Sequence, residues 1–106
     1  FAYTWSENAH EFRLTPWSAD TTGSSGGEAF YLRDEDTGKF WSPCAMPKRG
    51  ANPYITRHGF GYSTFEHSET GIESSLCVYV DTLDAVKYSV LKIKNNSLTT
   101  RRLSAT

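Results

Sequence analysis

Two short stretches of this sequence combine an aromatic ring with charged or polar side chains at close spacing. In RHGFGY, Arg57 and His58 stand a few residues before Tyr62, and in TPWSAD, Trp17 stands close to Asp20. Sugars are recognised by an apolar ring face that stacks on C–H groups, together with a few placed polar groups that fix the hydroxyls. These five residues are therefore the candidates for carbohydrate contacts.

Both stretches also have a structural interpretation, which stays open. A tryptophan directly after a proline often closes the end of a β-sandwich, and this packing role is the favoured one for Trp17. Gly59 and Gly61, two residues apart, indicate a bulge or a close backbone approach, which would serve a binding site and a fold equally well. Phe40 and Trp41 stand on a predicted hairpin, where we expect both to pack.

The sequence contains no motif for the other common catalytic or metal-binding sites. The sequence has no G-x-S-x-G, no P-loop and no H-E-x-x-H. Its histidines are scattered and neither cysteine has a partner at zinc spacing, so no metal and no cofactor are expected. Glycoside chemistry needs a pair of carboxyl groups flanking the bond. The sequence alone cannot show which acids would form such a pair, and the simpler interpretation is that each is a solvated surface group. The candidates are Glu7, Glu11, Asp20, Glu28, Glu66 and Glu69.

Length, charge and cysteine content limit the number of domains, the binding partners and the disulfides that can be expected. The chain has 106 residues, of which 38% are hydrophobic and 22% charged, and this predicts one compact domain over residues 1–106. A formal net charge of −1 offers no basic surface to nucleic acid or to an anionic membrane, so neither is expected as a partner. Cys44 and Cys77 are too few for a disulfide scaffold, and we interpret both as free thiols.

The elements that must position the candidate residues are strands. The stretch FYLRDEDTGKFWS, residues 30–42, predicts a hairpin that closes at Gly38. Residues 54–67 predict two strands separated by glycines, and strand composition returns after residues 71, 85 and 101. Strands at short intervals, with turn residues between them and no helical periodicity, predict an all-β fold, an antiparallel β-sandwich.

Three further expectations concern single segments. Residues 85–95 are apolar on both faces, which predicts a strand covered on both sides toward its end. Residues 18–29 are rich in glycine and serine, which predicts a surface loop. The chain begins at Phe1 and ends at Thr106 inside strand-like runs, so we expect a piece of a longer protein.

Four motifs together resemble the N-terminal β-sandwich segment of glycoside hydrolase family 94. They are YTWSENAHEFRLTPWSAD, GEAFYLRDEDTGKFWSP, PYITRHGFGYSTFEH and KNNSLTTRRLSAT. That family contains cellobiose, cellodextrin, chitobiose and cellobionic acid phosphorylases and the C-terminal region of cyclic β-1,2-glucan synthases. The opening SENAHEFRLTPW is most similar to the cyclic glucan synthase branch. The resemblance implies that the chain is part of a galactose-mutarotase-like super-sandwich.

The resemblance also implies a role. Enzymes of this family cleave a β-glucosidic bond with inversion, using inorganic phosphate as the nucleophile and an aspartate of a separate (α/α)6 barrel as general acid. This segment is then non-catalytic, and its implied partners are a β-glucan or gluco-oligosaccharide, inorganic phosphate, the remainder of the parent enzyme and a second copy in a homodimer. A cyclic glucan synthase parent would place the segment on the cytoplasmic side of a bacterial inner membrane.

The residues that carry over from the family's motifs are Arg57, His58 and Tyr62, as sugar or phosphate contacts. Trp17 and Asp20 come second, because Ala19 stands where relatives often have an asparagine that could bind a hydroxyl. Two alternatives stay open. An independent carbohydrate-binding module would bind sugar by itself through Trp17 or Tyr62. A purely structural interdomain or dimer-interface segment would bind none and would self-associate through unpaired strand edges.

Overall fold

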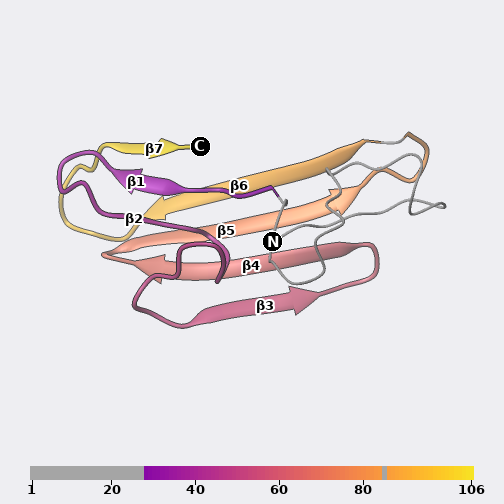
Figure 1. Cartoon of the computed structure of the whole chain (residues 1–106), viewed down its shortest axis with the longest axis horizontal. Coiled ribbons are helices and arrows are strands. Elements are labelled where there is room, and N and C mark those ends of the chain that lie inside the picture. Colours follow the sequence, from indigo (N-terminus) through magenta and orange to yellow (C-terminus); the bar gives the residue numbers. More distant parts are fainter. Residues whose placement is uncertain (1–27, 85) are drawn as a thin grey trace.

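The computed structural model describes residues 28–84 and 86–106, and every regular element in these ranges is a β-strand. The strands are β1 (Leu32–Asp34), β2 (Phe40–Trp41), β3 (Tyr54–His58), β4 (Tyr62–Glu69), β5 (Ile72–Val80), β6 (Lys87–Asn95) and β7 (Leu103–Ala105). They form a three-stranded sheet of order β2-β1-β7 and a four-stranded sheet of order β3-β4-β5-β6 (Figure 1). All pairings are antiparallel, so the predicted all-β antiparallel fold is confirmed.

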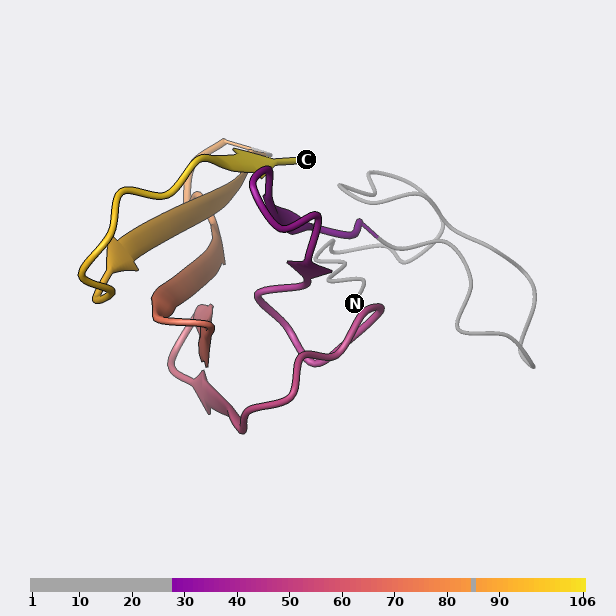
Figure 2. The same ribbon diagram turned by 90° about the vertical axis from the view of Figure 1, so that its left-hand side faces the viewer.

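The hydrophobic core lies between the two sheets. Figure 2 shows the four-stranded sheet on one side, with β1, β2 and the connection from residue 42 to residue 53 across from it. Leu32 of β1 and Trp41 of β2 pack with Ile72 of β5, and all three are buried. The hairpin that carries Leu32 and Trp41 closes as predicted, because Gly38 adopts a φ of 71° that suits a glycine.

A second cluster covers the middle of the four-stranded sheet. Cys44, from the connection after β2, packs on Phe65, Leu76 and Val78. Successive side chains of a strand point to opposite faces, so Cys77, between Leu76 and Val78, points to the outer face. The two thiols therefore lie on opposite sides of one sheet, and the interpretation of both as free thiols is confirmed. Burial raises the pKa of the Cys44 thiol.

Two packing expectations were wrong. Tyr88, Val90 and Ile93 of β6 are 39–43% exposed, so the described part of the chain does not cover this strand on both sides; β6 is an edge strand of its sheet. Trp41 is buried as expected, but Phe40 is 48% exposed because adjacent residues of a strand face opposite ways. In the part of the chain that the structure describes, no helix is long and apolar enough to cross a membrane.

A buried ion pair joins the small sheet to the far hairpin of the large one. Asp34 is fully buried at the end of β1 and accepts a hydrogen bond from the Arg101 guanidinium. Its Oδ1 also accepts the backbone N–H groups of Asp36 at 2.9 Å and Thr37 at 3.2 Å. Arg101 donates a second hydrogen bond, of 3.0 Å, to the Thr70 carbonyl between β4 and β5. The Asp34 carboxylate thereby fixes the β1–β2 turn directly and, through Arg101, the β4–β5 turn.

We expect Asp34→Asn to lower the urea midpoint of unfolding, because it leaves the partly buried Arg101 guanidinium without its carboxylate partner. The hydrogen bond from Arg101 is the largest influence on the Asp34 carboxyl and, with the backbone N–H groups, lowers its pKa despite burial. The stability from a lowered native pKa is present above the unfolded pKa and is lost as the pH falls through the native pKa. Urea titrations across the acid range should therefore show a steeper loss in the wild type than in Asp34→Asn. Equal slopes would contradict this assignment.

The β4–β5 turn holds a strained residue. Thr70 and Gly71 both have positive φ, 49° and 82°, as a type I′ hairpin turn requires. A β-branched side chain is disfavoured there, whereas Asn-Gly is preferred. We expect Thr70→Asn to raise the free energy of unfolding by about 1 kcal/mol, measured by urea denaturation. The backbone carbonyl that binds Arg101 is unchanged by this substitution.

Gly71→Ala is the matched control, since its positive φ is kept and its new Cβ would lie 3.1 Å from the Cβ of Ser97. This variant should lose stability. A loss in Thr70→Asn as well would show that the Thr70 hydroxyl, 3.5 Å from Arg101 Nη2, outweighs the backbone strain.

Candidate functional site

Tyr62 forms a half-exposed aromatic platform at the start of β4. Its carbonyl accepts the N–H of Gly59 at 2.9 Å, which closes the turn after β3. A Cβ at position 59 would lie 2.2 Å from atoms of the Tyr62 ring, so the ring can rest on this backbone only because the residue is glycine. The close approach that the glycines predicted is confirmed at Gly59. The Tyr62 side chain stays 47% exposed.

Arg57 lies on the same outer face as Tyr62. In the register of β3 and β4, Arg57 is opposite Thr64, two residues along β4 from Tyr62. Its guanidinium forms an ion pair with Glu66, and both side chains are partly exposed. An exposed ion pair adds little stability. Its donors and acceptors are accessible to a ligand that reaches this face.

His58 lies on the opposite face of the sheet from Arg57, because neighbours in a strand alternate. Its Nδ1 is 2.9 Å from the Ser63 hydroxyl, and its ring meets the edge of Phe65 at a centroid distance of 6.5 Å. The structure thus brings Arg57 and Tyr62 together on one face and separates His58 from them. A shared ligand contact by all three residues is not supported by this geometry.

Two tyrosines that the sequence analysis missed extend the platform. Tyr62 is the cross-strand partner of Tyr79, which is in turn the partner of Tyr88. The Tyr79 and Tyr88 rings stack at a centroid distance of 5.1 Å and an angle of 20°. The sequence does show a tyrosine in each of three neighbouring strands. Only the strand register shows that these tyrosines form one row.

Trp17 and Asp20, the second predicted pair, lie outside the described residues, and so does most of the predicted loop at 18–29. These two contacts stay predictions. Three of the acids considered for glycoside chemistry lie in the described part, and each forms an ion pair with a basic side chain. The pairs are Glu28 with Lys87, Glu66 with Arg57 and Glu69 with Lys39. Among the described residues, no group of three or more histidines, cysteines and acids is arranged to hold a metal ion.

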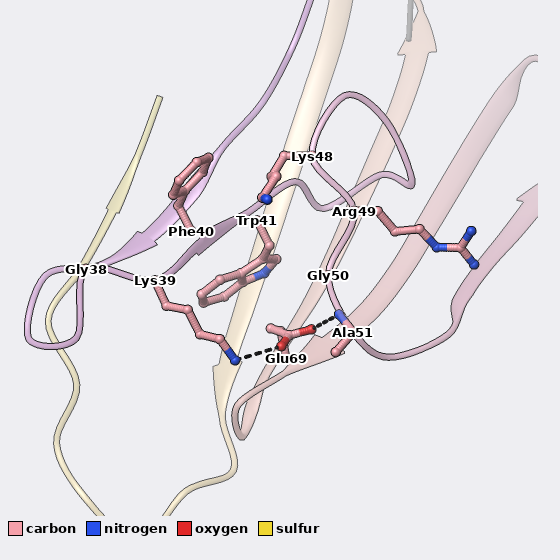
Figure 3. Close-up of a pocket in the computed structure, with 9 residues that line it drawn as sticks. All are labelled: Gly38, Lys39, Phe40, Trp41, Lys48, Arg49, Gly50, Ala51 and Glu69. Carbon is pink, nitrogen blue, oxygen red and sulfur yellow. Dashed lines mark hydrogen bonds and ion pairs between the residues drawn. The ribbon is translucent and has the colours of Figure 1, made fainter.

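A pocket of about 360 Å³ opens on the inner side of the four-stranded sheet (Figure 3). It lies between the end of the β1–β2 hairpin, the connection to β3 and the end of β4. Its lining residues are Gly38, Lys39, Phe40, Trp41, Lys48, Arg49, Gly50, Ala51 and Glu69. Aromatic, cationic and acidic groups therefore meet at this one place.

Glu69 is the carboxylate of the pocket. Its Oε1 is 3.3 Å from Lys39 Nζ, and its Oε2 accepts the backbone N–H of Ala51 at 2.9 Å. Burial raises the pKa of Glu69, but hydrogen bonds from Ala51, Lys39 and the Asn52 backbone outweigh burial, and the net pKa is lowered. Glu69 is therefore an ionised group whose charge is largely compensated by its own neighbours.

Tyr54 of β3 and His67 of β4 lie next to the pocket on the inner face of the four-stranded sheet. Their rings stack at 3.7 Å and are nearly parallel. The Tyr54 hydroxyl accepts the N–H of Gly50 at 2.7 Å and donates to the Ser42 carbonyl at 3.0 Å. His67 Nδ1 is 3.1 Å from the Pro53 carbonyl, which can only accept, so Nδ1 carries the proton. These hydrogen bonds hold the β2–β3 connection over the sheet.

Gly50 is required for that closeness. An added Cβ would lie 2.4 Å from Glu69 Oε2 and 2.6 Å from His67 Nε2, and both side chains are buried. We expect Gly50→Ala to cost about 1–3 kcal/mol of unfolding free energy through overpacking, measured by urea denaturation. Gly59→Ala should cost less, because the half-exposed Tyr62 ring can move into solvent. A Gly50→Ala variant as stable as the wild type would contradict the rigid arrangement described.

The fold and these sites define an antiparallel β-sandwich domain with an aromatic outer face and a polar inner pocket. The whole chain, residues 1–106, matches the glycosyl hydrolase 94 supersandwich domain, and the chain belongs to this family. The resemblance inferred from the four motifs is confirmed, and the sandwich expected from them is the family's own architecture.

Curated relatives come from both branches of the family. The chain is 34% identical over 103 residues to the cyclic beta-(1,2)-glucan synthase NdvB of Rhizobium meliloti, a match that covers 96% of the chain and 4% of the relative. It is 37% identical over 73 residues to a solabiose phosphorylase of Paenibacillus borealis, which covers 68% of the chain and 10% of the relative. It is 33% identical over 97 residues to an N,N'-diacetylchitobiose phosphorylase of Vibrio furnissii, covering 88% and 12%. The chain thus spans a small part of these relatives' lengths.

Proposed function

We propose that this chain is a non-catalytic β-sandwich part of a larger family 94 enzyme, a cyclic β-1,2-glucan synthase or a related inverting sugar phosphorylase. Catalysis then belongs to the remainder of the parent enzyme. The family match over the whole chain and the names of relatives from both branches support this proposal. For a glucan synthase parent, the proposed location is the cytoplasmic side of a bacterial inner membrane.

The proposed task of the chain is to hold a β-glucan or gluco-oligosaccharide against the outer face of the four-stranded sheet. The observation that carries this proposal is the Tyr62 ring resting on Gly59 beside the Arg57–Glu66 pair. The ring offers an apolar surface to sugar C–H groups. The guanidinium donates to hydroxyl oxygens and the carboxylate accepts hydroxyl protons. Inorganic phosphate is a second ligand to test at Arg57.

The deciding experiment is an amide NMR titration of the chain with β-1,2-gluco-oligosaccharides, then cellobiose, then phosphate. Saturable shifts should centre on Arg57 and Tyr62, and Tyr62→Ala should weaken sugar binding by about tenfold, the equivalent of about 1.4 kcal/mol. Gly59→Ala should weaken sugar binding too. This variant keeps Tyr62, but the new Cβ displaces the Tyr62 ring. Tyr31→Ala, which removes a tyrosine directly before β1, is the matched control and should bind like the wild type.

One observation favours a second candidate, a structural interface without sugar affinity. The edge strand β6 exposes Val90 and Ile93, which an adjoining strand or a second copy would cover. Dispersed peaks that no sugar moves, with concentration-dependent self-association in sedimentation, would favour this interface role over sugar binding. A parent gene without a downstream aspartate-bearing helical barrel would contradict the family 94 enzyme assignment for either role.

A further inference from the structure

The outer face of the four-stranded sheet repeats one residue pattern on two of its strands. β4 and β6 are both antiparallel to β5, so they run in the same direction on either side of it (Figure 1). Tyr62 of β4 and Tyr88 of β6 share one cross-strand partner, Tyr79. Four residues further along the two strands, Glu66 and Lys92 share another partner in β5. Each of the two strands therefore presents a tyrosine and then a charged side chain, in the same two rows across the sheet.

The two outer tyrosines of this row are the accessible ones. Tyr62 is 47% and Tyr88 is 41% exposed, whereas Tyr79 between them is half-buried. The Tyr79 ring stacks on the Tyr88 ring at a centroid distance of 5.1 Å, so one face of Tyr88 is covered. Neighbouring strands of a sheet are about 4.8 Å apart, which places the backbones of Tyr62 and Tyr88 about 10 Å apart. A single sugar ring is too small to contact both tyrosines.

Each exposed tyrosine has charged hydrogen-bonding groups on the same face of the sheet. Arg57 and Glu66 form a partly exposed ion pair on the Tyr62 side. Lys92 is exposed on the Tyr88 side, and its ammonium group offers three donors. A row of shorter side chains lies between the tyrosines and the charged row: Thr64, Cys77 and Val90. A sugar chain lying across the strands over this row meets aromatic rings along one side and hydrogen-bonding groups along the other.

We propose, on the basis of the sugar face proposed above, that Tyr88 and Lys92 form a second sugar subsite, and that the face binds an oligosaccharide running across β4, β5 and β6. One sugar unit lies against Tyr62 and a later unit of the same chain lies against Tyr88. Because the two units are covalently joined, the second contact is intramolecular and adds to the affinity without a second association from solution. Affinity therefore increases with the length of the sugar chain, which a platform at Tyr62 alone does not explain.

The test is an amide NMR titration of the ¹⁵N-labelled chain with glucose and with glucose oligomers of two and five units, in a β-1,2-linked and a β-1,4-linked series. In at least one series, the five-unit oligomer should bind at least about tenfold more tightly than the two-unit oligomer. Its saturable shifts should include the amides of Tyr62, Tyr88 and Lys92 at one common dissociation constant. A common constant shows that one ligand occupies both subsites.

Two exposed residues of β6 provide the matched variants. Tyr88→Ala should reduce the gain from chain length to less than about twofold, because it removes the second ring and keeps Tyr62. Ile93→Ala should keep the gain, since Ile93 is 43% exposed on the opposite face of the same strand. Where the spectrum of Tyr88→Ala shows that it does not fold, Tyr88→Thr removes the ring with a residue that favours strands.

The outcomes separate the second subsite from the sugar face on which it depends. Sugars that bind at Tyr62 with no gain from chain length, or an equal loss of the gain in Tyr88→Ala and Ile93→Ala, would overturn the second subsite and leave the sugar face standing. If no sugar shifts any amide, the proposed sugar face is itself wrong, and the second subsite is wrong with it.

Discussion

The tertiary arrangement depends on the ion pair between Asp34 and Arg101. A buried carboxylate must be compensated by hydrogen bonds and opposite charge, and the planar guanidinium of Arg101 reaches both Asp34 and the Thr70 carbonyl. The β1–β2 turn, the β4–β5 turn and the segment before β7 therefore meet at one point. That meeting also brings Lys39 of the first hairpin to Glu69 at the end of β4. Gly38, Lys39 and Glu69, which stand in or beside these two turns, line the inner pocket.

The four-stranded sheet carries different chemistry on its two faces because its side chains alternate. The inner face holds the core and the stacked pair of Tyr54 and His67, which supports the polar pocket. The outer face holds the Arg57–Glu66 pair and the row of tyrosines that starts at Tyr62. A one-residue change of register would exchange these sets, so the pairing of β3 with β4 determines what each face can bind.

Two glycines of the described residues allow a close approach that a side chain would block. At Gly59 its missing side chain lets an aromatic ring lie on the backbone, and at Gly50 it lets the β2–β3 connection approach Glu69 and His67. Gly59 lies beside the proposed sugar contact on the outer face, and Gly50 lines the pocket on the inner face. The proposed sugar face thus depends on a glycine that leaves room for the Tyr62 ring.

The sequence by itself determined the antiparallel strands, the hairpin that closes at Gly38 and the membership of the family, because these depend on local turn chemistry and on short contiguous motifs. Only the tertiary structure decided which residues of those strands are buried. It separated His58 from Arg57, exposed Phe40 beside a buried Trp41, and placed Tyr62 in a row with residues of two other strands. It also joined Asp34 to Arg101, 67 residues away. Burial, register and ion pairing depend on partners distant in sequence, and no local pattern specifies which partner arrives.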